Sequence, residues 1–302
     1  MLEPKKKMYD KAGPRVAAAL QKRNMEAYYC PTAAEAVEKV LELIPAGDVV
    51  SWGGVATVDE LGIKGRLRSR NQPVIDRDTA RTPEERTAML HQALTCDTFL
   101  MSSNAISADG QLVNLDGNAN RVAALCYGPE SVLVIAGMNK VMGDLDSAIA
   151  RARQVAAPAN AQRFDIKTPC AVTGSCGDCT SPDCICCQMV ITRACRPAGR
   201  IKVILVGERL GQLIGHRGET LDAIQQLTNY AINTGSDSKR VRVQMDAENY
   251  RARREQSLES LARKVATKVQ KYRRSVTLEP MNAYERHVIH AALQDVPGVN
   301  TY

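Results

Sequence analysis

The chain has few aromatic residues and few histidines. Its 302 residues include two Phe, one Trp and four His, and aromatic residues make up 4% of the composition. Nucleic-acid binders of the RRM and OB types stack bases on aromatic side chains, so this composition argues against them. His91 is the only histidine in the first 200 residues. A histidine-based general acid/base mechanism is therefore disfavoured in that part of the chain.

Long hydrophobic runs are also missing. The N-terminus is basic, but the apolar stretch that follows it, residues 16–20, is too short for a signal-peptide core. No stretch approaches the roughly 18 apolar residues of a membrane span. We therefore expect a cytoplasmic protein without a membrane partner. In a reducing cytosol, clustered thiols hold metals more often than they form disulfides.

Cysteine and charge divide the sequence into two parts. Seven of the ten cysteines lie between Cys170 and Cys195, and none follows. Residues 1–195 contain 22 basic and 22 acidic residues, whereas residues 196–302 contain 18 basic against 11 acidic, so the whole net charge of +7 belongs to the last third. A one-signed basic segment favours binding to phosphates. The sequence thus predicts a neutral, thiol-bearing module and a basic module.

The first module alternates predicted strands and helices. Strands are expected at 26–30, 48–52, 98–102 and 131–136, helices at 12–24, 32–43 and 144–155, and a proline-containing link at 156–160. This order predicts an α/β layered body. Asp109-Gly110 and Asp116-Gly117 have the composition of hairpin-type turns.

A Gly-Gly turn follows the second predicted strand. Gly53 and Gly54 come directly after the segment 48–52, and Thr57 with Glu60 forms a capping-box pattern behind them. A strand, a glycine turn and a capped helix can together bind an anion at the helix N-terminus. The same pattern fits a tight connection without a ligand, because Gly-Gly alone is a weak signal.

Four cysteines have the spacing of a metal site. Cys170, Cys176, Cys179 and Cys186 fall as C-x5-C-x2-C-x6-C, and Cys184, Cys187 and Cys195 add further thiols. A C-x2-C pair brings two thiolates to one ion, and soft sulfur donors suit zinc or an iron–sulfur cluster. Because no histidine is near, the expected site is all-thiolate, which favours an iron–sulfur cluster and leaves zinc as the alternative. Buried free cysteines or a disulfide are the explanations without a metal.

Several short segments of the first module form a recognisable set. They are Ser51-Trp52-Gly53-Gly54 with Glu60-Leu61-Gly62, Asn104-Ala105-Ile106, Asn120-Arg121-Val122, Ala136-Gly137-Met138-Asn139-Lys140, Thr173-Gly174-x-Cys176 and residues 200–210. Through them, residues 1 to about 208 resemble the lactate-utilisation (LUD) domain family in its short form.

The LUD resemblance implies a layered fold like the NagB/CoA-transferase group and an association with lactate oxidation through iron–sulfur redox partners. It implies no defined reaction, so catalytic residues stay unassigned. The side chains that would line the family's cleft are Asn120, Arg121, Asn139 and Lys140, next to Gly53 and Gly54. Turn formation by the Asn residues and solvated charge for the basic residues are the alternative.

The basic module begins with a predicted strand at 201–206 and two helices that meet at Gly215-His216-Arg217-Gly218. Two glycines let the backbone approach a nucleic-acid backbone closely, while Arg217 and helix amides meet phosphates. This arrangement is typical of the GXXG loop of KH domains, and an ordinary helix–helix turn is the alternative. Further on we expect a strand at 240–245, a long helix at 248–272 with Leu258 and Leu261 on its apolar face, a strand at 276–278, and a helix from Asn282 to Leu293.

Basic residues crowd the long helix and the helix after it. Nine Arg and Lys lie between residues 251 and 274, and Arg286 and His290 share one face of the last helix. With Tyr250-Arg251-x-Arg253-Arg254 and Leu278-Glu279-Pro280-Met281-Asn282, these features make residues 209–302 resemble the Jag (SpoIIIJ-associated) family, a KH domain followed by an Arg-x-x-x-His domain. The resemblance implies binding of single-stranded RNA or DNA by Gly215, His216, Arg217, Gly218, Arg251, Arg254, Arg286 and His290. A solvated helix face without a ligand is the alternative.

The chain looks like a fusion or chimera of three parts: an α/β domain at 1–208, and a small α+β unit made of a KH-like domain at 209–247 and an Arg-x-x-x-His-like domain at 248–302. The last domain is expected to be truncated, because the chain ends where the Jag family continues into another strand. Residues 200–211 fit both families, although one strand does not readily serve two sheets. We expect single-stranded RNA binding joined to a metal-bearing body. The alternative is an iron–sulfur redox protein of lactate oxidation with an incidental basic tail.

Overall fold

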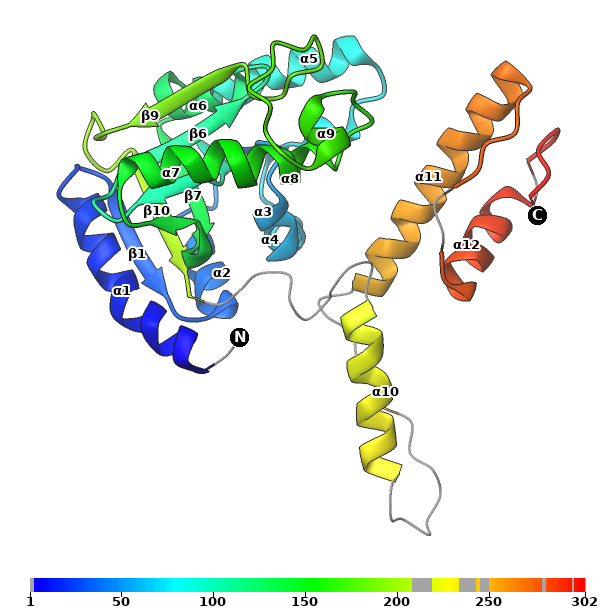
Figure 1. The fold of residues 1–302 in the computed structure, drawn as a ribbon, viewed down its shortest axis with the longest axis horizontal. Helices are drawn as coiled ribbons and strands as arrows, with labels where there is room; N and C mark the ends of the chain where they lie inside the picture. The colour runs from blue at the N-terminus through cyan, green and yellow to red at the C-terminus, as the bar shows by residue number, and fades with distance from the viewer. Residues whose placement is uncertain are drawn as a thin grey trace. The chain divides into compact units, whose positions relative to one another are not determined.

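The chain folds as two units, Met1–Leu210 and Gly211–Tyr302. The computed structural model describes residues 3–207, 219–233, 243–244, 250–278, 281–294 and 296–301, and Figure 1 traces their helices and strands. Across these residues, no helix combines the length and the apolar character needed to cross a bilayer.

A parallel sheet of six strands forms the centre of the first unit (Figure 1). In spatial order the strands are β1 (Glu26–Cys30), β10 (Ile201–Val206), β7 (Ser131–Gly137), β4 (Thr98–Met101), β2 (Val50–Trp52) and β3 (Val74–Ile75). All neighbours in this sheet are parallel. Parallel strands with both faces covered consist of continuous apolar runs, which explains why the sequence predicted β7 and β10 well. The carboxyl ends of all six strands lie at one edge.

A smaller sheet packs against the first. Its strands, in order, are β8 (Val141–Met142), β5 (Ala105–Ser107), β6 (Leu112–Asp116) and β9 (Gln188–Thr192). Side chains alternate between its two faces: Ile106 and Leu112 join the main core, whereas Ala105, Val113 and Leu115 pack on the other side against Ala148, Ala152 and Ala157. The layered α/β body predicted from the sequence is therefore confirmed.

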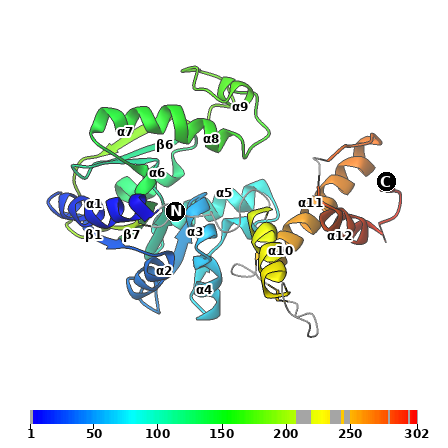
Figure 2. The ribbon, with the colours of Figure 1, turned by 60° about the horizontal axis from the view of Figure 1, so that its bottom comes forward.

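Nine α-helices are described in the first unit. They are α1 (Glu3–Gln21), α2 (Ala33–Glu42), α3 (Ala56–Glu60), α4 (Ile63–Ser69), α5 (Pro83–Gln92), α6 (Asn120–Tyr127), α7 (Leu145–Arg151), α8 (Ala157–Ala161) and α9 (Pro169–Thr173). Helices α1 and α2 cover opposite faces of β1 (Figure 2), since Gly13 of α1 abuts the Tyr29 ring while Lys39 of α2 lies 5.0 Å from the centroid of the Tyr28 ring.

Strand β10 lies inside the six-stranded sheet. It pairs with β1 through Glu26↔Lys202 to Cys30↔Val206 and with β7 through Ile201↔Val132 to Val206↔Gly137. Val203, Ile204, Leu205 and Val206 have no exposed surface. A strand paired on both sides has its backbone N–H and C=O groups engaged with its two neighbours. The segment that fits both families is therefore a strand of the first unit.

The second unit contains α10 (Glu219–Asn233), α11 (Tyr250–Tyr272) and α12 (Ala283–Leu293). Leu258, Ala262 and Ala266 form a stripe along α11 that packs against Val288, Ile289 and Leu293 of α12. The small alanines, four residues apart, let the two helices approach closely. The predicted stripe was partly wrong, because Leu261 is 39% exposed. The predicted cap of α12 is confirmed: the Asn282 side chain accepts from Glu285 N at 2.8 Å, and Glu285 Oε2 accepts from Asn282 N.

Four local predictions were wrong. Thr57 does not cap α3; Val55 precedes the helix without a side-chain cap, and Thr57 is buried inside it. The Asp116-Gly117 pair closes no hairpin, because Asp116 Oδ2 accepts the backbone N–H groups of Arg121 and Val122 at the start of α6. The expected link at 156–160 is largely helical, since Pro158 sits in the first turn of α8, where no N–H is needed. Residues 276–278 form no strand. The predicted strand at 240–245 lies largely outside the described residues.

Two glycines in helices test the packing of the first unit. We expect Gly13→Ala to destabilise it by about 1–3 kcal/mol, because a Cβ there collides with the Tyr29 ring of β1. Gly65→Ala in α4 should instead stabilise it by about 0.5–1 kcal/mol, since no atom lies within 4 Å of that Cβ position. Urea unfolding followed by the fluorescence of Trp52, the single Trp, measures both. Equal effects of the two substitutions would contradict the α1–β1 packing.

Candidate functional site

The edge of the six-stranded sheet where β2 and β4 end is a candidate ligand site. The chain leaves β2 toward β3 on one side and β4 toward β7 on the other, although β2 and β4 are neighbours. In open α/β sheets, ligands bind outside the carboxyl ends of strands at such a switch in direction. Gly53 and Gly54 follow β2, Ser102 follows β4, and Lys140 lies just beyond β7.

Arg121 lies under the Gly-Gly turn, with 14% of its side chain exposed. A Cβ on Gly53 would lie 3.0 Å from Cδ of Arg121. The guanidinium donates through Nη1 to Ser102 O and Asn114 Oδ1, both at 2.8 Å, and through Nη2 to Asn104 Oδ1 at 3.0 Å and Leu115 O at 2.5 Å. Both terminal nitrogens are thus used within the protein. Arg121 ties the ends of β4, β5 and β6 together and is not a solvated charge.

Lys140 and Glu60 form a coupled pair at the same edge. Lys140 Nζ donates to Ser102 Oγ at 2.7 Å. Burial is the main cause that lowers the pKa of Lys140 to about 8; Arg151 and Arg121 lower it as well, and Glu60 raises it. Desolvation by the surrounding protein atoms raises the pKa of Glu60, against the effect of Lys140. The two pKa values move toward each other, as expected of a pair that can exchange protons near neutral pH.

The remaining predicted cleft residues lie around this pair. Asn139 is exposed, and its carbonyl accepts from Arg151 Nε at 3.3 Å. Asn120 is the first residue of α6 and is half-buried. Helix α3, which follows Gly53 and Gly54, has only five residues. An anion at this turn would therefore depend on basic side chains more than on helix amides.

The thiols of residues 170–195 are arranged differently from the predicted set. Cys184 Sγ lies 3.4 Å from Cys186 Sγ and also interacts with the thiols of Cys179 and Cys187. Cys170 is buried, with its Sγ 3.3 Å from Thr168 Oγ1. An all-thiol donor set suits a soft metal ion. Nevertheless, among the described residues no group of three or more His, Cys, Asp and Glu side chains stands in a metal-holding arrangement.

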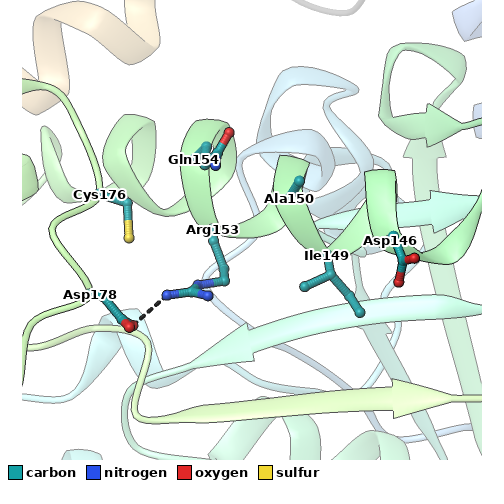
Figure 3. Close-up of a pocket in the computed structure, with 7 residues that line it drawn as sticks. All are labelled: Asp146, Ile149, Ala150, Arg153, Gln154, Cys176 and Asp178. Carbon is teal, nitrogen blue, oxygen red and sulfur yellow. Dashed lines mark hydrogen bonds and ion pairs between the residues drawn. The ribbon is translucent and has the colours of Figure 1, made fainter.

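A hollow of about 380 Å³ lies beside this thiol segment. Figure 3 shows Cys176 and Asp178 on one side and α7 with the π-helical turn Ala152–Ala156 on the other, joined by the ion pair between Arg153 and Asp178. The pair closes one end of the hollow with charges that neutralise each other.

The predicted nucleic-acid residues are partly described. Arg286 and His290 are exposed on α12, with Arg286 Nη1 donating to Met281 O at 3.3 Å and His290 Nδ1 2.7 Å from Thr301 Oγ1. Arg251 of α11 is half-buried. The Gly215-His216-Arg217-Gly218 loop and the Arg254 side chain lie outside the described residues.

Comparison with known families accounts for both units. A model of the LUD domain matches residues 14–206. The chain belongs to the LUD domain family. Residues 189–245 match the KH domain of KhpA/KhpB, and residues 256–302 match the Arg-x-x-x-His domain. The two resemblances seen in the sequence are confirmed. We refer to the first unit as the LUD body.

Named relatives cover about a third of the chain. RNA-binding protein KhpB of Clostridium symbiosum is 53% identical over 95 residues, 32% of this chain and 42% of that protein. KhpB of Bacillus subtilis is 42% identical over 93 residues, 31% of this chain and 44% of that protein. The chain thus spans less than half the length of these relatives. A DUF162 family protein from Deinococcus radiodurans shows a weak structural likeness, with 13% identity, a TM-score of 0.39, and coverage of 65% of this chain and 97% of that one.

The sequence analysis missed three residues of the sheet edge. Ser102, which binds Lys140, directly follows β4, and a search for polar residues after each predicted strand would have found it. Glu60 was read only as a helix cap. Arg151 donates to Asn104 O and Asn139 O from α7, a contact between distant segments for which local sequence carries no signal.

The pKa of Lys140 tests the proximity of Glu60. In the full chain, we expect NMR titration of the Lys140 side chain to give a midpoint of about 8, against 10.5 for an ordinary lysine. Glu60→Gln should lower this pKa further, because it removes the negative charge that favours the protonated amine. Glu84→Gln, on exposed α5, is the control and should change nothing. A midpoint near 10.5, or an unchanged pKa in Glu60→Gln, would contradict the geometry.

Proposed function

We propose that the chain is an RNA-binding protein whose second unit holds single-stranded RNA. The observation that carries this proposal is the 53% identity to a protein named RNA-binding protein KhpB. Adjoining matches to a KH domain and an Arg-x-x-x-His domain support it, as does the net charge of +7 in residues 196–302. Basic charge supplies the sequence-independent part of nucleic-acid affinity.

The geometry of α11 and α12 supports an RNA-facing surface. Arg286 and His290 are exposed on α12, which the Asn282–Glu285 capping box and the apolar contact with α11 hold in place. On α11, Arg263, Lys264 and Lys268 are exposed as well. We propose that Arg286 and His290 contact phosphate or base and that the α11 cations extend the contact along the strand.

RNA titration of the full chain tests this assignment. Binding of a labelled single-stranded RNA should weaken linearly with the logarithm of salt concentration. Arg286→Ala should weaken it roughly tenfold or more, because a charge-assisted contact is lost. The double substitution Gly215→Asp and Gly218→Asp should weaken it further by placing carboxylates at the phosphates.

Lys11→Ala is the matched control for charge removal. Lys11 is exposed on α1 of the LUD body, so its loss should leave the affinity unchanged. Equal losses in Lys11→Ala and Arg286→Ala would reduce the interaction to non-specific attraction and refute the assigned surface.

We propose, second, that the segment 170–195 holds a soft metal ion or an iron–sulfur cluster through its thiolates. The interactions of Cys179, Cys186 and Cys187 with Cys184 support this, since they bring several sulfur donors into one loop. Recruiting Cys170 and Cys176, as the spacing suggests, would require the loop to close around the ion.

Metal analysis tests the thiol proposal. Anaerobically purified protein should contain iron with acid-labile sulfide, or zinc, in stoichiometric amount. Cys179→Ser should abolish the metal content, whereas Cys126→Ser, an exposed thiol outside the segment, should not. Folded, metal-free wild-type protein would refute the proposal.

A further inference from the structure

Arg77 is a largely buried cation whose guanidinium has no hydrogen-bond acceptor among the described residues. It begins the 3-10 turn η1 (Arg77–Thr79) shortly after β3, and 14% of its side chain is exposed. Its Nε is buried and unsatisfied within the described ranges. The carboxylate oxygen that faces it, Asp78 Oδ1, is 3.7 Å from Nε, beyond hydrogen-bond distance. Asp78 also faces Lys64 and Arg86 at 3.3 and 3.8 Å.

The position of Arg77 is that of a ligand-binding group. Its Nη2 lies 2.9 Å from the position a Cβ on Gly54 would take, so the guanidinium sits against the turn that ends β2. Gly54 itself is exposed to solvent. Arg77 therefore stands at the β2/β4 switch point, where α/β sheets bind ligands. Arg121, on the Gly53 side, has its terminal donors used within the protein, whereas those of Arg77 meet no acceptor in the described part of the chain.

A second unsatisfied donor lies at the same strand end. Trp52 is the last residue of β2 and is 1% exposed, yet its indole Nε1 has no acceptor in the part of the chain described. Lys64 lies 5.0 Å from the centroid of this ring and forms an ion pair with Asp78, the residue that faces Arg77. Trp52 and Arg77 thus belong to one cluster. Buried donors without acceptors are costly, and two of them in one place point to a bound acceptor.

The charges of this edge favour a ligand with a single negative charge. Each cation faces one carboxylate: Arg121 faces Asp116, Arg77 faces Asp78, and Lys140 interacts with Glu60. A phosphate dianion would meet these carboxylates at close range. A carboxylate adds one charge, and its two oxygens match the fork of N–H donors on a guanidinium.

We propose that the carboxyl end of β2 binds the carboxylate of a small organic acid and that Arg77 is the residue that recognises it. The site is separate from the RNA-facing surface and does not depend on it. Nothing in the sequence singles out Arg77, which follows a strand of only two residues and reaches Gly54 from a different segment.

Trp52 supplies the test, because it is the only Trp in the chain and lies in the same cluster as Arg77. The full chain is excited at a wavelength selective for Trp and titrated separately with acetate, glycolate, L-lactate and inorganic phosphate. We expect a saturable change in emission with at least one of the three acids and a smaller response at equal concentrations of phosphate. No saturable change with any acid, or tighter binding of phosphate, would overturn the proposal.

Variants then assign the effect to Arg77. Arg77→Met should weaken acid binding about tenfold or more, and Arg77→Lys, which keeps the charge but loses the fork, should weaken it too. Arg86→Met is the control, since Arg86 faces the same Asp78 but is 48% exposed, and its affinity should stay within about twofold of wild type. Urea unfolding, read from the same fluorophore, shows whether each variant is folded. A folded Arg77→Lys variant with wild-type affinity would refute the role of Arg77.

Discussion

Strand β10 carries the constraint on which the rest of the structure depends. It occupies the second position of the six-stranded sheet, paired in parallel with β1 and β7, and its side chains from Val203 to Val206 are fully buried. Since both of its edges are used, its backbone has no groups left for another sheet. The LUD match ends at residue 206, while the KH match begins at residue 189. The residues shared by the two matches, including β9 and β10, are built into the LUD body.

This allocation explains how the two proposed activities are distributed. The LUD body keeps a complete parallel sheet, and with it the switch point between β2 and β4, where Arg121 holds three strand ends together and leaves Arg77 and Lys140 facing the Gly-Gly turn. The second unit keeps the helices that present basic side chains, with α11 and α12 packed on each other through a core of their own. A small-acid site and an RNA-facing surface can therefore coexist on one chain without sharing residues.

The sequence predicted what depends on local pattern and missed what depends on packing between distant segments. Buried strands such as β7 and β10 are continuous apolar runs, and Asn282 with Glu285 has the composition of a helix start, so these elements were found. Arg121 was read as a ligand or a solvated charge, because its acceptors, Ser102, Asn104 and Leu115, come from separate segments. Cys184 was treated as a spare thiol, since spacing alone does not show how the loop folds back on it.

Native-state hydrogen exchange of the full chain, with and without saturating single-stranded RNA, tests most directly that β10 belongs to the LUD body. The account predicts that the amides of Lys202 to Val206 exchange as slowly as those of β7, and that RNA leaves their rates unchanged, because opening β10 requires opening the six-stranded sheet. Fast exchange of β10 beside a protected β7, or protection that follows RNA binding, would show that the strand serves the KH region and would contradict the account.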